Sequence, residues 1–104
     1  GEWQVMIQRS TILLVDGCHA DRDTYCQYLL ADNKLANDKL QLQILVAASG
    51  QQGLELCQQL LPDLVLVEFR LPDLDGLEFI RRLQSLTDRS LTGKTLPVVM
   101  LTRY

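Results

Sequence analysis

The chain has 104 residues, 47% of them hydrophobic and 22% charged, which suits a single soluble globular domain and is short for two. Its formal net charge of −3 argues against a surface that neutralises the phosphates of DNA or RNA, so we expect no direct nucleic-acid contact. The apolar runs at 64–67 and 98–101 are far too short to span a bilayer, so we expect no membrane contact.

The three cysteines, Cys18, Cys26 and Cys57, form no C-x-x-C pair. We interpret them as reduced thiols of a cytoplasmic protein. Cys18 beside His19 could suggest a metal site, but a structural zinc site usually needs four ligands and the chain has only one histidine. A loop cysteine next to a solvent-facing histidine is the preferred interpretation.

The first half of the chain predicts two strands and two helices. Residues 1–10 have no clear period and are expected to be a linker or tail. The apolar run 12–15 predicts a buried strand, and the spacing in 20–32 predicts a helix. Alternation over 40–46 predicts a strand near the sheet edge. A capping box at Ser49 then opens a helix that ends before Pro62.

The second half repeats this order. The run 64–67 predicts a buried strand that ends in Glu68, and Asp75 caps the following helix after a loop around Pro72. Residues 97–101 predict a fourth strand, which ends at Thr102. Four side chains are interpreted as packing residues: Tyr25, Tyr28, Phe79 and Leu83.

Strict alternation of strands and helices predicts a parallel sheet with helices on both faces. Chemistry in such sheets lies beyond the carboxyl ends of the strands. Asp16, Glu68, Arg70 and Thr102 are all expected at this edge. The pattern therefore gathers two carboxylates, a guanidinium and a hydroxyl at one rim.

Three stretches carry a family resemblance: 12–17, 62–76 and 96–102. Together they resemble the receiver domain of bacterial two-component response regulators, and the likeness covers residues 11–104. The resemblance implies an α/β, flavodoxin-like, doubly wound parallel sheet of strand order 2-1-3-4-5. It also implies that the domain is a signalling module and not an enzyme.

A receiver takes a phosphoryl group from a sensor histidine kinase onto an aspartate, helped by magnesium. The cation offsets the negative charge of the phosphoryl transition state. A Thr or Ser hydroxyl, here Thr102 by the match, then turns inward to hydrogen-bond the phosphoryl group.

The chain departs from this family first at Glu68, which occupies the position of the phospho-accepting aspartate. The extra methylene moves the carboxylate outward by about 1.5 Å, one C–C bond length. In-line attack tolerates such errors poorly. A glutamate at this position also places negative charge where a phosphoryl group would lie, so it can mimic the phosphorylated form.

The second departure is Gly17, which occupies the position of the family's second, metal-contacting acid. The remaining ligands are Asp16, Glu68 and the backbone carbonyl of Arg70. Magnesium demands near-octahedral oxygen geometry. We therefore expect at most a weak magnesium site and no other cofactor.

The third departure is that the sequence stops at Tyr104, after the fourth strand. The family's last strand, its active-site lysine and its aromatic switch residue lie beyond this point, so the expected sheet is truncated after strand four. A bare fourth strand is an exposed edge, and we expect this chain to self-associate.

Three functions compete. The leading one is a degenerate receiver, a pseudo-receiver, that works without phosphorylation through contacts with a sensor histidine kinase or with other domains of its own protein. The alternative is a phosphorylatable receiver in a phosphorelay with relaxed active-site chemistry. The third is a small flavodoxin-like ligand binder or enzyme, but the chain has neither a glycine-rich phosphate loop nor a recognisable catalytic triad.

Overall fold

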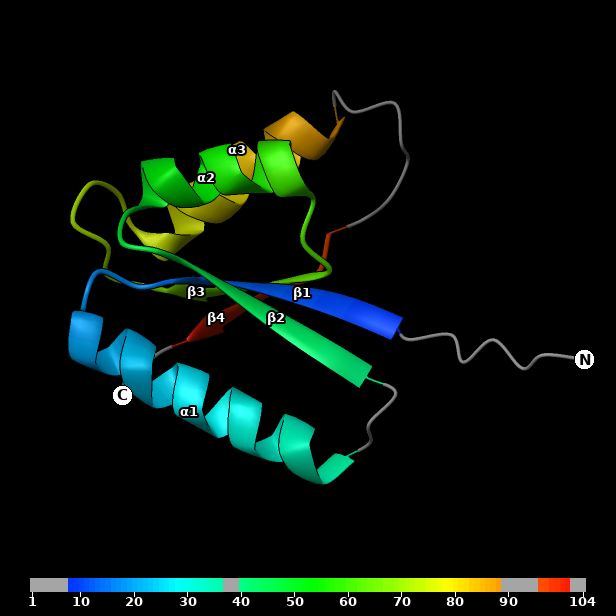
Figure 1. Ribbon diagram of the computed structural model, residues 1–104. Coiled ribbons are helices and arrows are strands. Elements are labelled where there is room, and N and C mark those ends of the chain that lie inside the picture. Colours follow the sequence, from blue (N-terminus) through cyan, green and yellow to red (C-terminus); the bar gives the residue numbers. More distant parts are fainter. Residues whose placement is uncertain (1–7, 37–39, 89–95, 102–104) are drawn as a thin grey trace, which may run out of the picture.

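A computed structural model describes residues 8–36, 40–88 and 96–101 of the chain. Strands and helices alternate as predicted (Figure 1). The elements are β1 (Gln8–Val15), α1 (His19–Ala36), β2 (Leu40–Ala47), α2 (Gly50–Leu60), β3 (Leu64–Glu68), α3 (Gly76–Asp88) and β4 (Val98–Leu101).

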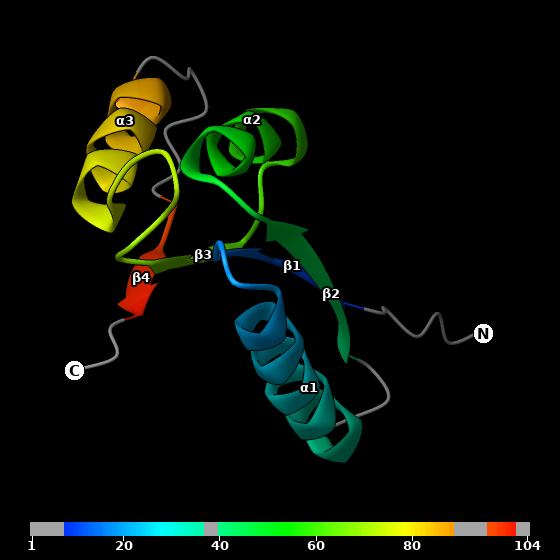
Figure 2. The ribbon, with the colours of Figure 1, turned by 90° about the vertical axis from the view of Figure 1, so that its left-hand side faces the viewer.

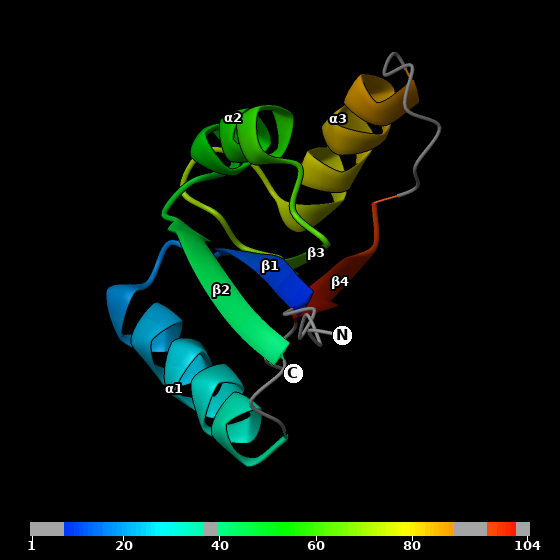
Figure 3. The same ribbon diagram turned by 45° about the vertical axis from the view of Figure 1, so that its right-hand side comes forward.

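The strands form one four-stranded sheet in the order β2-β1-β3-β4, and all neighbouring strands are parallel. α2 and α3 cover one face of this sheet and α1 covers the other (Figures 2 and 3). The fold is therefore the doubly wound, flavodoxin-like arrangement predicted from the sequence, with β1 and β3 at its centre.

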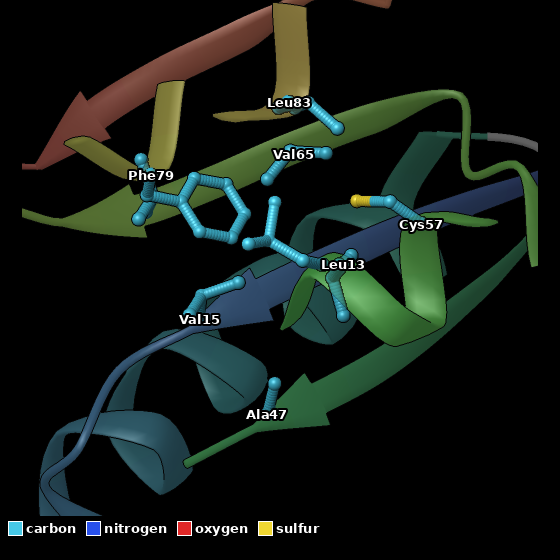
Figure 4. Close-up of a cluster of buried hydrophobic side chains, with 9 residues drawn as sticks. Leu13, Val15, Ala47, Cys57, Val65, Phe79 and Leu83 are labelled. Carbon is cyan, nitrogen blue, oxygen red and sulfur yellow. The ribbon is translucent and has the colours of Figure 1, made fainter. Parts of the chain in front are cut away.

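The hydrophobic core lies between the sheet and the α2–α3 layer (Figure 4). Leu13 and Val15 of β1 are paired in register with Val65 and Val67 of β3, and all four side chains are fully buried. The Phe79 ring of α3 packs onto this row and is also fully buried. Alternate residues of parallel strands face one side of a sheet, so the two central strands supply one continuous apolar surface.

Two of the predicted packing residues, Phe79 and Leu83, are confirmed as core, since their exposed fractions are 0% and 3%. Tyr25 is partly buried. The prediction for Tyr28 is wrong, because its side chain is 70% exposed. Helical periodicity turns Tyr25 and Leu29 of α1 toward the sheet and leaves Tyr28 on the outer side.

β1 begins at Gln8, earlier than the apolar run from Ile12 suggests. Its first residues pair with β2 from Gln8↔Leu40 onward, whereas its pairing with β3 starts only at Ile12. Backbone pairing extends the strand through polar residues, so residues 8–10 belong to the sheet and not to the expected tail. The rest of that tail, residues 1–7, lies outside the described residues.

The helix ends largely follow the predicted capping residues. The Ser49 hydroxyl accepts a hydrogen bond from the Gln52 N–H at the start of α2, and Asp75 Oδ1 accepts one from the Glu78 N–H at the start of α3. The Gln52 side chain accepts from the Ala48 N–H, one residue earlier than a standard capping box requires. α2 ends at Leu60, and the C-cap residue Leu61 has a left-handed φ of 45°.

Among the helices that the structure describes, none is long and apolar enough to cross a membrane.

Candidate functional site

The predicted acidic residues meet in one pocket at the carboxyl end of the sheet. Asp16 directly follows β1 and Glu68 ends β3, and these two strands are neighbours. The pocket that contains both is completed by the turn after β1 and the loop after β3; its lining consists of Asp16, Gly17, Cys18, Asp21, Glu68, Arg70, Leu71 and Pro72. The structure thus brings together three of the four predicted site residues, and Thr102 lies outside the described residues.

Both carboxylates are withdrawn from solvent. The exposed fraction of Asp16 is 2% and that of Glu68 is 8%. Asp16 Oδ1 accepts a hydrogen bond of 2.9 Å from the Cys18 N–H. Within the described part of the chain, no donor reaches Asp16 Oδ2 or Glu68 Oε2. A buried acceptor that no donor reaches costs about 1–3 kcal/mol, so Asp16 Oδ2 and Glu68 Oε2 are the atoms of this pocket at which a donor would bind most favourably.

The electrostatic consequence is visible at Glu68 and at a neighbouring tyrosine. Burial raises the pKa of Glu68, and the nearby charge of Asp16 raises it further. Burial also raises the pKa of Tyr25 on α1, and the charges of Glu68 and Asp16 add to this. Tyr25 therefore lies within electrostatic range of both acids, which the sequence did not indicate.

The turn between β1 and α1 is held by Arg22. Its Nη1 donates a hydrogen bond of 2.7 Å to the backbone carbonyl of Asp16, and its own N–H donates to the carbonyl of Cys18. Asp16 is thereby fixed through both its side chain and its carbonyl. Sequence reasoning missed Arg22, because its only signal is a position on the first turns of a predicted helix.

The loop between β3 and α3, residues 69–75, forms the opposite wall of the pocket. The loop is closed by a hydrogen bond of 2.6 Å from the Gly76 N–H to the Phe69 carbonyl and by a bridge between Arg70 and Asp75. A Cβ at Gly76 would lie 3.0 Å from Phe69 Cα, so only glycine fits this crossing without a shift. The closed loop holds Arg70 on the pocket rim.

The same loop crosses closely over Gly17. A Cβ built at Gly17 would lie 3.0 Å from Pro72 Cδ, closer than side-chain carbons normally approach. The position where the family carries its second acid is thus partly occupied by the proline ring. An aspartate at position 17 would require the loop to move by a few tenths of an ångström.

The residues present do not fit a magnesium ion well. Asp16, Asp21 and Glu68 each carry a carboxylate and Arg70 lines the same pocket, but Gly17 supplies no side-chain oxygen. In residues 8–36, 40–88 and 96–101, no group of three or more His, Cys, Asp or Glu side chains could hold a metal ion. Magnesium needs about six oxygen ligands in octahedral array, which the side chains of this pocket supply only in part.

The model of the response regulator receiver domain family matches residues 12–104 of this chain. The chain therefore belongs to the response regulator receiver domain family, the signalling module of two-component systems.

Curated relatives agree with this family. The chain is 39% identical over 59 residues to the transcriptional regulatory protein AfsQ1 of Streptomyces coelicolor. The matched segment is 57% of this chain and 23% of AfsQ1. It is 42% identical over 48 residues to the nitrate/nitrite response regulator protein NarL of Escherichia coli K12. The matched segment is 46% of this chain and 21% of NarL. The chain thus spans less than a quarter of the length of these regulators.

Solved structures agree in fold. The response regulator receiver domain (CheY-like) of Methylobacillus flagellatus superposes with a TM-score of 0.74 at 21% identity, over 93% of this chain and 72% of that one. The N-terminal domain of the response regulator receiver protein from Methanoculleus marisnigri superposes with a TM-score of 0.70 at 28% identity, over 88% and 65%.

Proposed function

We propose that this domain is a degenerate receiver that signals through protein contacts without accepting a phosphoryl group. The observation that carries the proposal is Glu68, which ends β3 where the family has its phospho-accepting aspartate and lies buried beside Asp16. The glutamate carboxylate reaches about one C–C bond farther than that of aspartate, which misplaces an in-line attack.

Two further features support this proposal. Gly17 supplies no second acid, so the pocket has little capacity for the cation that phosphoryl transfer needs. Pro72 lies against Gly17, so the loop after β3 fits a glycine at position 17 and would have to shift for an aspartate there. The ionised Glu68 carboxylate supplies negative charge at the pocket without phosphorylation, and that charge holds the domain near one signalling state.

The partners proposed are a sensor histidine kinase or other domains of the same protein, in the cytoplasm. AfsQ1 is named as a transcriptional regulatory protein and NarL as a response regulator, which favours a role in two-component signalling. We also propose that the 104-residue segment, when produced by itself, self-associates through β4, which pairs only with β3 among the described strands and carries the half-exposed Val99. A monomer mass by light scattering at high concentration would contradict self-association.

The experiment that tests the proposal is intact-mass spectrometry of the full-length protein after incubation with acetyl phosphate and magnesium. The variants Glu68→Asp and Glu68→Asp/Gly17→Asp are treated in parallel, and an ordinary receiver in the same reaction checks the reagents. We expect a phosphoryl mass on the restored variants and none on the natural chain. The alternative function, a phosphorelay receiver, requires a phosphoryl mass on the natural chain that maps to Glu68, and that result would overturn the proposal.

A further inference from the structure

Asp73 joins the loop after β3 to the beginning of α2. Its Oδ1 accepts a hydrogen bond of 2.8 Å from the Gly50 N–H, and its Oδ2 accepts one of 2.8 Å from the Gln51 N–H. Residues more than twenty positions apart in the sequence are thus tied by both oxygens of one carboxylate. Hydrogen bonds between an ionised acceptor and backbone N–H groups are among the stronger ones in proteins.

This contact completes the capping of α2. The first N–H groups of a helix have no partners within the helix. The Asp73 carboxylate accepts hydrogen bonds from the N–H groups of Gly50 and Gln51, and the Ser49 hydroxyl accepts one from the N–H of Gln52. Burial acts to raise the pKa of Asp73, but hydrogen bonds from Gln51, Gly50 and the loop outweigh it, so the pKa lies below its ordinary value. The ionised carboxylate is therefore the form that holds the helix.

An apolar contact reinforces the polar one. A Cβ built at Gly50 would lie 2.6 Å from Cγ of Leu74, so the Leu74 side chain is seated directly on the backbone of Gly50. Gly50 is buried, and Leu74 also packs against the hydrophobic core. The loop is consequently anchored to the first turn of α2 by two adjacent residues.

The other end of this anchor is the acid pocket. Pro72, directly before Asp73, lies against Gly17 and lines the pocket together with Leu71 and Arg70. A displacement of Asp73 would move Pro72 relative to Gly17, because the two loop residues are consecutive and the loop is closed by the Gly76–Phe69 hydrogen bond.

We propose that Asp73 is a positioning residue for the acid pocket: its two hydrogen bonds to α2 fix Pro72 over Gly17, so that the first turn of α2 and the pocket mouth form one mechanical unit. A partner that displaces the start of α2 then changes access to Asp16 and Glu68, and a change in the pocket reaches α2. The inference shares its site with the proposed function but does not depend on whether Glu68 accepts a phosphoryl group.

The test is amide hydrogen exchange and backbone chemical shifts by NMR of the full-length protein. The variant is Asp73→Ala, and the matched control is Ser49→Ala, which removes a cap from the same helix end without touching the loop. We expect Asp73→Ala to lower protection about tenfold at Gly50 and Gln51 and also at Gly76, relative to core amides, because the loop opens with the cap. We expect the Gly17 amide resonance to shift in Asp73→Ala only.

Loss of protection confined to Gly50 and Gln51, with Gly76 and Gly17 as in the natural chain, would overturn the proposal and leave Asp73 as a helix cap. If Asp73→Ala does not fold, Asp73→Asn decides the matter, since its single side-chain carbonyl can replace one of the two acceptors. Partial protection at Gly76 in Asp73→Asn supports the proposal, and full protection opposes it. Phosphorylation of Glu68 in the mass experiment would refute the proposed function while leaving these outcomes unchanged.

Discussion

Substitution of Glu68 by glutamine should stabilise this domain at neutral pH. Glutamine has nearly the same shape, removes one of two buried like charges and offers an N–H to Asp16 Oδ2, which has no donor in the described residues. Relieving a buried acceptor gains about 1–3 kcal/mol. Any hydrogen bond that the ionised carboxylate accepts becomes a neutral one in the glutamine variant, which loses about 1 kcal/mol. The expected net gain in the free energy of unfolding is therefore at most about 2 kcal/mol.

The effect should depend on pH with a definite sign. The pKa of Glu68 is raised in the folded state, so the folded protein holds this proton more tightly than the unfolded chain. The protonated Glu68 side chain therefore contributes stability that is fully present below the ordinary glutamate pKa. This contribution is lost as pH rises through the folded-state pKa of Glu68. Glutamine does not titrate. The stability difference between Glu68→Gln and the natural chain should therefore be small near pH 4 and largest near pH 7.

Thermal or urea unfolding at several pH values measures this difference. A gain of 1 kcal/mol raises the Tm of a domain this size by about 4–8 °C. Glu55→Gln serves as the control, since it makes the same substitution at an exposed acid on α2, outside the acid pocket. A less stable Glu68→Gln protein, or a stability difference that does not vary with pH, would refute the account of two buried carboxylates in conflict.

Three further predictions concern the core and the thiols. Phe79→Ala should lower the free energy of unfolding by about 3–5 kcal/mol, because the ring is fully buried at the centre of the core. Gly53→Ala should destabilise by about 1–2 kcal/mol, since its Cβ would lie 2.8 Å from Val15 Cγ2 and overpacking outweighs the gain of about 1 kcal/mol in helix propensity. Burial raises the pKa of the Cys57 thiol to about 11, so at pH 8 a thiol reagent should modify exposed Cys18 readily and leave Cys57 unmodified until the protein unfolds.

Each of these predictions has its own check. Urea unfolding of Leu77→Ala, on the same helix as Phe79 but half-exposed, should show a loss below about 1 kcal/mol. A Gly53→Ala protein more stable than the natural chain would mean that Val15 moves aside at little cost. Peptide mapping after alkylation distinguishes the thiols, and native-state labelling of Cys57 at the rate of Cys18 would show that the core opens readily.

The sequence alone determined the fold class and the two central acids. Alternating apolar runs and helical periodicity are signals within a few residues, so they predicted four strands, three helices and the exit of Asp16 and Glu68 at one sheet edge. The caps at Ser49 and Asp75 were also readable, because each acts on an N–H three residues away.

Only the tertiary structure decided which residues of different helices, strands and loops contact one another. The hydrogen bonds from Gly50 and Gln51 to Asp73 join segments more than twenty residues apart, and no local pattern marks either partner. The start of β1 at Gln8 follows from backbone pairing with β2, which side-chain hydrophobicity does not record. The approach of Pro72 to Gly17 likewise depends on how a closed loop meets a turn on another strand. Such contacts are set by the packing of whole elements, and sequence patterns describe each element separately.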